Sequence, residues 1–193
     1  RPGALAMKIF QSSAVRLCLV LGLLAPGLAI AQGSLDVARY SDAGALQRPA
    51  DLATWVHMGS SLGSDYRSAP FDPAQPGVIG VVQMEPTAYD YFVEHGRYAD
   101  GSMFLLSFYG AEVNSDPQLQ GFVQGELRAQ EIHVIDAQRF GDGRAFFMFQ
   151  DPAQTESTPL AAGNECVQCH EAEGQYNGTF LQFYPTLRSR PRN

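Results

Sequence analysis

The pattern of hydrophobic and polar positions predicts an α+β protein that is mainly β. Apolar residues between Leu52 and Met58 recur at helical spacing after Asp51, a residue type that often caps a helix. We therefore expect a short helix there. The stretch 64–77 contains three prolines among small and polar residues, which predicts a surface loop.

The middle of the chain predicts one strand, one helix and three further strands. Residues 78–82 read as a strand, and Pro86 at the start and Gly96 past the end indicate a helix of two to three turns between them. Three later stretches are rich in β-formers, namely Met103–Tyr109 after a turn at Asp100 and Gly101, Gly121–Asp136 and Gly143–Phe149. This order favours an antiparallel sheet over regular βαβ alternation. A loop from Gln150 to Asn164 follows.

The amino end has the features of a secretory signal peptide. Lys8 and Arg16 precede an apolar run at 17–24, and small residues at 29–31 suit a cleavage site. The run is soon interrupted by Pro26 and falls short of the roughly 20 residues that a membrane-spanning helix needs. We therefore expect residues 1–31 to be removed on export.

Cleavage after Ala31 leaves 162 residues, which we interpret as one domain over 34–193. Residues 1–6 precede Met7, the first plausible initiator, and suggest an over-extended start. Cleavage changes the formal net charge from −7 to −10, because it removes three basic residues and no acid. So acidic a protein is a poor partner for nucleic acid or anionic membrane. It suits a basic redox protein or a small neutral ligand.

The cysteines carry the clearest chemical signal. Cleavage would remove Cys18 and leave Cys166 and Cys169, in a compartment where such pairs are normally oxidised or otherwise occupied. Both lie in the segment Cys166-Val167-Gln168-Cys169-His170. Two thiols one helical turn apart can each add to a haem vinyl group, and the adjoining histidine can ligate the iron. The motif predicts one covalent haem c, with iron bound by His170.

Three other interpretations of the cysteine pair are weaker. A disulfide would close a very small loop and leave the adjoining histidine as a coincidence. A thioredoxin-like redox pair would need a βαβ context, which the surrounding sequence lacks. A structural zinc site would need a fourth ligand, and His57, His95 and His133 show no ligand-pair spacing.

The haem would also need an apolar wall and, for some functions, a sixth ligand. The segment Thr179–Pro185 is aromatic and should pack beside the motif. Candidate wall residues are Phe104, Phe108, Phe146, Phe147, Phe180, Phe183 and Tyr184, although for any single one of them an ordinary core position is the more common role. Candidate sixth ligands are Met84, Met103, Met148 and His133. Spacing alone distinguishes none of them.

An ordered set of segments between Trp55 and Leu187 resembles the cytochrome P-460 family, whose relatives include cytochrome c′-beta. The segments are Trp55–His57, Glu85–Tyr89, Gly96–Ser102, Gln124–Leu127, Glu131–Asp136, the haem motif and Phe180–Pro185. The resemblance implies a homodimeric, mainly antiparallel β-sheet protein of the periplasm. It also implies that His170 is the proximal ligand and that the distal side is open to a small ligand.

The chain departs from the hydroxylamine-oxidising members of that family, which carry a lysine cross-linked to the haem. Lys8 is the only lysine, and it would be lost with the signal peptide. We therefore expect no cross-link, an ordinary haem c absorption spectrum and poor hydroxylamine oxidation.

Enzymes of the family also use a distal glutamate to move protons. Glu126, 44 residues before His170, is the position we match to it as a catalytic residue. On a strand Glu126 alternates with Glu131 and His133, which would then face the other side of the sheet. A buried carboxyl of raised pKa could relay protons, whereas a solvated glutamate on a sheet face would not.

Three functions follow from these features. The first is a binding protein that captures nitric oxide or a similar ligand at an open distal site. The second is a redox enzyme that oxidises hydroxylamine or reduces peroxide. The third is an electron-transfer cytochrome with a protein side chain as sixth ligand.

Overall fold

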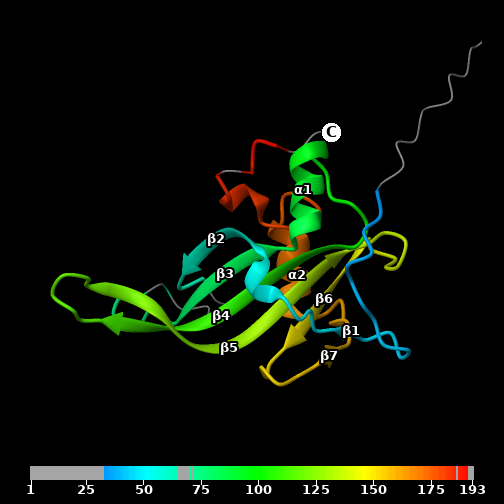
Figure 1. The fold of residues 1–193 in the computed structure, drawn as a ribbon. Coiled ribbons are helices and arrows are strands. Elements are labelled where there is room, and N and C mark those ends of the chain that lie inside the picture. Colours follow the sequence, from blue (N-terminus) through cyan, green and yellow to red (C-terminus); the bar gives the residue numbers. More distant parts are fainter. Residues whose placement is uncertain (1–32, 65–69, 71, 186, 191–193) are drawn as a thin grey trace, which may run out of the picture. The chain divides into compact units, whose positions relative to one another are not determined.

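The computed structural model describes residues 33–64, 70, 72–185 and 187–190, so the predicted signal peptide lies outside the described residues. They form a five-stranded antiparallel sheet of order β2-β3-β4-β5-β6 and a small antiparallel sheet of β1 and β7 (Figure 1). The strands are β1 (Leu46–Gln47), β2 (Val56–Leu62), β3 (Val78–Met84), β4 (Ser102–Asn114), β5 (Gly121–Ile135), β6 (Arg144–Phe149) and β7 (Glu156–Ser157). The helices are α1 (Pro86–His95), α2 (Glu165–Glu173) and two 3-10 turns at Leu52–Thr54 and Leu181–Phe183. The predicted class, α+β and mainly β, is confirmed.

The predicted run of strand, helix and three strands matches β3, α1, β4, β5 and β6. The ends of α1 show why the prediction succeeds. The Glu85 side chain accepts a hydrogen bond from Ala88 N, and Pro86 occupies the first turn. Gly96 ends the helix in the left-handed region at φ 67°. None of the described helices has the length and apolar character required to span a bilayer.

The helix predicted around Leu52–Met58 is wrong. Only Leu52–Thr54 is helical, as one 3-10 turn, and the Asp51 side chain makes no capping hydrogen bond. The backbone then enters β2, where Val56 pairs with Met84 of β3. Pairing along this strand outweighs the weak local helical pattern.

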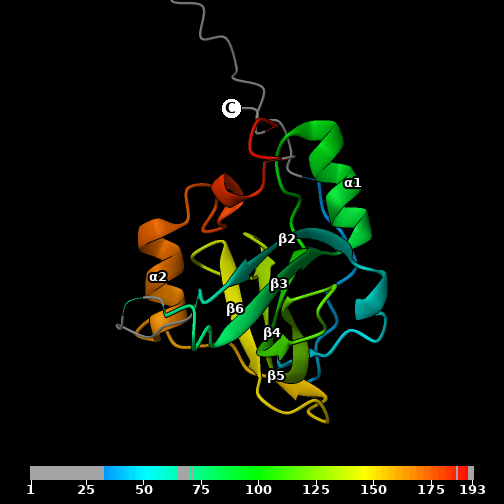
Figure 2. The same cartoon turned by 90° about the vertical axis from the view of Figure 1, so that its left-hand side faces the viewer.

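The five-stranded sheet has two buried faces because side chains alternate along each strand. One face carries Met103, Leu105, Ile132, Val134 and Phe147, which form a core with Leu46 and Trp55 from the amino-terminal segment. The opposite face carries Phe104, His133 and Phe146, which are cross-strand neighbours. Helices α1 and α2 lie over this second face, with the carboxyl-terminal segment between them (Figure 2).

A buried hydrogen bond ties the carboxyl-terminal segment to the rest of the domain. The Thr179 hydroxyl donates to Tyr176 O at 2.7 Å, so the Tyr98 hydroxyl is the donor in its 3.1 Å bond to Thr179 Oγ1. The Tyr98 ring stacks on Phe92 of α1 at 4.7 Å. This packing fixes the segment that forms one side of the functional site.

The β4–β5 hairpin projects beyond the other strands (Figure 1). Its register shifts beside Tyr109, and pairing then continues to its tip. Four of the six large hydrophobic residues that are exposed in the described chain lie on it, namely Val113, Leu119, Phe122 and Val123. The hairpin is therefore an unusually apolar projection.

Candidate functional site

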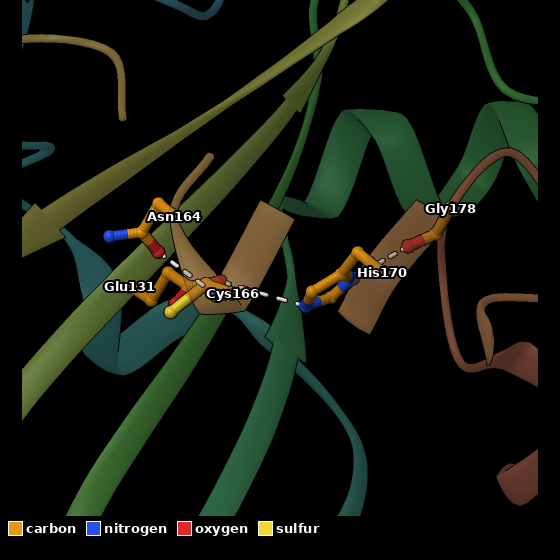
Figure 3. Close-up of polar contacts among 5 residues, drawn as sticks. All are labelled: Glu131, Asn164, Cys166, His170 and Gly178. Atoms are coloured by element: carbon orange, nitrogen blue, oxygen red, sulfur yellow. Dashed lines mark hydrogen bonds and ion pairs between the residues drawn. The ribbon is translucent and has the colours of Figure 1, made fainter. Parts of the chain in front are cut away.

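Helix α2 presents both cysteines of the motif. Asn164 caps the helix, and its side-chain oxygen accepts a hydrogen bond from Cys166 N at 2.9 Å (Figure 3). Cys166 and Cys169 are separated by one helical turn, and so lie on neighbouring positions of one helix face. Cys166 is buried and Cys169 is half-buried. Burial is the largest cause that raises the pKa of Cys169 and keeps it a thiol.

His170 is held so that one ring nitrogen remains available. Its Nδ1 donates to the carbonyl of Gly178 at 2.6 Å, because a carbonyl can only accept (Figure 3). The turn that presents this carbonyl has Asn177 at φ 49° and Gly178 at φ 71°. With the proton on Nδ1, Nε2 keeps its lone pair and can ligate a metal.

Aromatic rings fix the plane of the His170 imidazole. The ring centroids of Phe146 and Phe180 lie 4.6 and 4.8 Å from it, and that of His133 lies 5.6 Å away. Burial, the largest cause, lowers the pKa of His170. The imidazole is therefore both rigid and neutral, as a metal ligand must be.

A cavity of about 600 Å³ opens beside Cys169 and His170. Its walls come from β2, β3, β4, β5, α2 and the carboxyl-terminal segment. The lining residues are Gly59, Ser60, Ser61, Ser64, Val82, Phe104, Leu105, Leu106, Phe108, Glu131, His133, Cys169, His170, Thr179, Phe180, Phe183 and Tyr184. The wall is mainly apolar, which suits a large hydrophobic cofactor.

Glu131 is the carboxylate of this cavity. It is 2% exposed, and one of its oxygens, Oε2, has no hydrogen-bond partner among the described residues. Burial raises the pKa of Glu131, and a hydrogen bond with the Cys166 thiol opposes that rise. Its Oε1 lies 3.6 Å from His170 Nε2 (Figure 3), too far for a hydrogen bond. Because burial drives both groups towards neutrality, we interpret the two side chains as a neutral contact and not as an ion pair.

His133 is the second buried polar side chain of the cavity wall. Its ring stacks on Phe146, its cross-strand neighbour, at 4.2 Å. Burial lowers the pKa of His133 well below its usual value. Its Nε2 has no partner among the described residues. A buried imidazole nitrogen and a buried carboxylate oxygen without partners are costly unless a bound group completes the site.

These residues fit a haem. Two thiols on one helical turn, an imidazole with an available Nε2 and an adjoining apolar cavity are the donor set and the space that a c-type haem needs. No group of three or more His, Cys, Asp or Glu side chains in the described residues is arranged to hold a metal ion directly. A structural zinc site of the four-ligand kind is thus without support in this part of the chain.

Some of the wall residues and sixth ligands that the sequence suggested lie at this cavity, and others do not. Phe104, Phe108, Phe180, Phe183 and Tyr184 line the cavity, and Phe146 packs on His170. Phe147 lies instead in the core on the opposite face. Of the candidate sixth ligands, His133 lines the cavity, whereas Met84, Met103 and Met148 are not among the lining residues.

Glu126 lies outside the cavity. It is exposed and is absent from the lining, so the geometry gives no support to a catalytic role for it. The expectation that Glu126 faces away from Glu131 by simple alternation does not hold, because the register of β5 shifts between these two residues, opposite Tyr109. Which face of the sheet α2 covers is likewise decided by tertiary packing. Glu131 is the functional candidate that the sequence reasoning passed over.

The fold and this donor set together define a mainly β, haem-binding cytochrome. The chain belongs to the cytochrome P460 family, whose model matches residues 49–181. This confirms the family resemblance seen in the sequence, and membership implies that the protein binds haem. A comparison with curated proteins gives no match.

Proposed function

We propose that this protein is a periplasmic c-type cytochrome that binds a small ligand such as nitric oxide at an open distal position. When bound, the haem supplies an iron that can take up a diatomic ligand and exchange single electrons. The observation that carries the proposal is the apolar cavity of about 600 Å³ beside His170. The rest of the proposal concerns what the side chains around that cavity do.

Helix α2 anchors the cofactor in this proposal. Cys166 and Cys169 would form the two thioether bonds, and Nε2 of His170 would be the proximal ligand. The hydrogen bond from Nδ1 to Gly178 O fixes the tautomer and the ring orientation before any cofactor binds. Phe146 and Phe180 keep water from the imidazole.

The positions of Met84 and Met103 favour an open site over an electron carrier with either of them as sixth ligand. Met84 packs in the core under α1, and Met103 packs on the opposite face of the sheet. Neither can reach the cavity without a rearrangement of its core. His133 does line the cavity, but stacking on Phe146 and contact with Phe104 restrain its ring.

The composition supports an ordinary haem c. Residues 32–193 contain no lysine, so no lysine of the predicted mature chain can bond to the macrocycle. We propose that hydroxylamine oxidation is poor for this reason. A red-shifted Soret band in the purified protein would contradict this part of the proposal.

Glu131 favours a second candidate function, a redox enzyme that reduces peroxide or oxidises hydroxylamine. Its buried carboxyl lines the cavity, and burial raises its pKa, which suits a group that takes up and releases protons. In this alternative, Glu131 would be the acid or base.

We further propose that the protein is a homodimer. The apolar side chains exposed on the β4–β5 hairpin support this, because contiguous apolar surface often marks a protein interface. Val113 and Phe122 are paired across the hairpin, so two of the exposed side chains are adjacent. A second copy of the same hairpin is the occupant we propose.

Covalent haem attachment and ligand uptake test the main proposal together. The parent protein, expressed with cytochrome c maturation, should keep its haem through acid and acetone extraction and should bind one nitric oxide per ferrous haem. Cys169→Ala should lose one thioether bond, detected by the position of the pyridine haemochrome band. Cys18→Ser is the matched control, because Cys18 precedes the predicted cleavage site. Haem that is fully extractable from the parent would overturn the proposal.

A further inference from the structure

We propose that Arg144 raises the reduction potential of the bound haem, through its positive charge beside the hydrogen bond that holds His170. The inference rests on the proposed function, since it concerns the histidine that would ligate the iron. Arg144 would act through His170 and would not touch the ligand, so it is a positioning residue and not a catalytic one.

The side chain of Arg144 packs directly on the turn that holds His170. Arg144 begins β6, opposite Ile135 of β5. A Cβ atom built on Gly178 would lie 2.8 Å from Arg144 Nε and 3.3 Å from its Cζ. The guanidinium therefore occupies the space into which a side chain at position 178 would project. The carbonyl of the same glycine accepts the His170 Nδ1 proton at 2.6 Å (Figure 3).

The Arg144 charge is not neutralised by a close ion pair. Among the described residues, no carboxylate forms a salt bridge with it, although Asp142, Glu171 and Arg139 line a second cavity of about 270 Å³ with it. Its side chain is half-buried, so water screens it only in part.

The direction of the effect follows from charge. A ferric haem carries one more positive charge than a ferrous haem, and a nearby cation disfavours the more positive state. Arg144 should therefore stabilise the ferrous form. One partly screened unit charge close to the iron ligand shifts the equilibrium between ferrous and ferric haem by about three- to tenfold.

Three substitutions separate charge from packing. Arg144→Met and Arg144→Gln remove the charge and keep much of the length, whereas Arg144→Lys keeps the charge. Arg128→Gln is the control, because Arg128 is exposed on the hairpin and the substitution changes the net charge equally. Each holoprotein is poised at the midpoint potential of the parent, and the ratio of ferrous to ferric haem is read from its spectrum.

We expect the ratio to fall about three- to tenfold in both neutral variants and to stay near the parent value in Arg144→Lys and Arg128→Gln. Circular dichroism identifies a variant that has not folded, and two neutral variants keep the test available if one fails. The inference fails if the haem-loaded neutral variants keep the parent ratio of ferrous to ferric haem. It also fails if the ratio in Arg144→Lys falls as far as in the neutral variants. Either result leaves the proposed function intact. A parent chain that attaches no haem would overturn the proposed function and the inference with it.

Discussion

Oε1 of Glu131 lies 3.6 Å from Nε2 of His170, and both residues line the cavity. The two residues come from β5 and α2, and they meet because Glu131 and His133 lie on the face of the sheet that α2 covers. A carboxyl and an imidazole are thus the two reactive groups that the fold brings together. The roles we propose for them differ, with His170 as the iron ligand and Glu131 as a source of protons.

Substitution of Glu131 tests the enzymatic candidate. If the protein turns over peroxide or hydroxylamine, Glu131→Gln should lower the rate by about 100-fold, because the amide cannot take up or release the proton. Glu126→Gln is the matched control and should leave the rate unchanged, since Glu126 is exposed. Steady-state rates on haem-loaded protein measure both. A rate that falls in Glu126→Gln and not in Glu131→Gln would restore the sequence-based assignment.

The sequence predicted those structural features that are set by residues close together in the chain. The ends of α1 and the turn before β4 are each set by a few neighbouring residues, and these predictions match the structure. The haem motif is equally local, and haem attachment through it stays a prediction. The helix expected near Trp55 was wrong because pairing with β3 decides that segment, where Val56 pairs with Met84, 28 residues further along the chain. Glu131 was missed for a similar reason. Alternation shows which residues share a face, but only tertiary packing shows which face becomes the site.

Phe146 should contribute strongly to stability. Its side chain is 2% exposed and packs on His133 and His170. We expect Phe146→Ala to lower the free energy of unfolding by about 3–5 kcal/mol, because it leaves a cavity under α2. Phe183→Ala is the comparison, since Phe183 is 68% exposed and should cost about 0.5 kcal/mol or less. Urea unfolding measures both variants, and equal losses would contradict the packing described.

Alkaline pH should destabilise the fold partly through Tyr184. Burial raises the pKa of Tyr184 to about 12, above the value near 10 of an unfolded chain. A group whose pKa is raised on folding stabilises the fold fully below its unfolded pKa and loses that contribution as pH rises through the folded value. Stability should therefore fall between about pH 10 and 12.

Tyr184→Phe removes this titration. Because the ring is only partly buried, we expect the fall over that range to be smaller by about 1–2 kcal/mol in the variant. Unfolding free energies from urea titrations at several alkaline pH values give the comparison. Parallel curves for parent and variant would show that Tyr184 titrates alike in both states.

The proposed dimer should depend on the β4–β5 hairpin. Val113→Glu combined with Phe122→Glu places two charges on its apolar surface, and like charges facing each other across two copies repel. Sedimentation should show a dimer for the parent and a monomer for this variant. Phe183→Glu adds a charge at another exposed aromatic residue and should leave the dimer intact. A double variant that remains dimeric would place the interface elsewhere.

The spin state of the ferrous holoprotein tests the central claim most directly, because an open distal position requires five-coordinate iron. Optical spectra should show a high-spin ferrous form, and electron paramagnetic resonance should detect the ferric haem and the nitrosyl adduct that forms when the ferrous haem takes up nitric oxide. The spectra should be disrupted in His170→Ala. Low-spin iron in both oxidation states, or a spectrum unchanged by His170→Ala, would contradict the account.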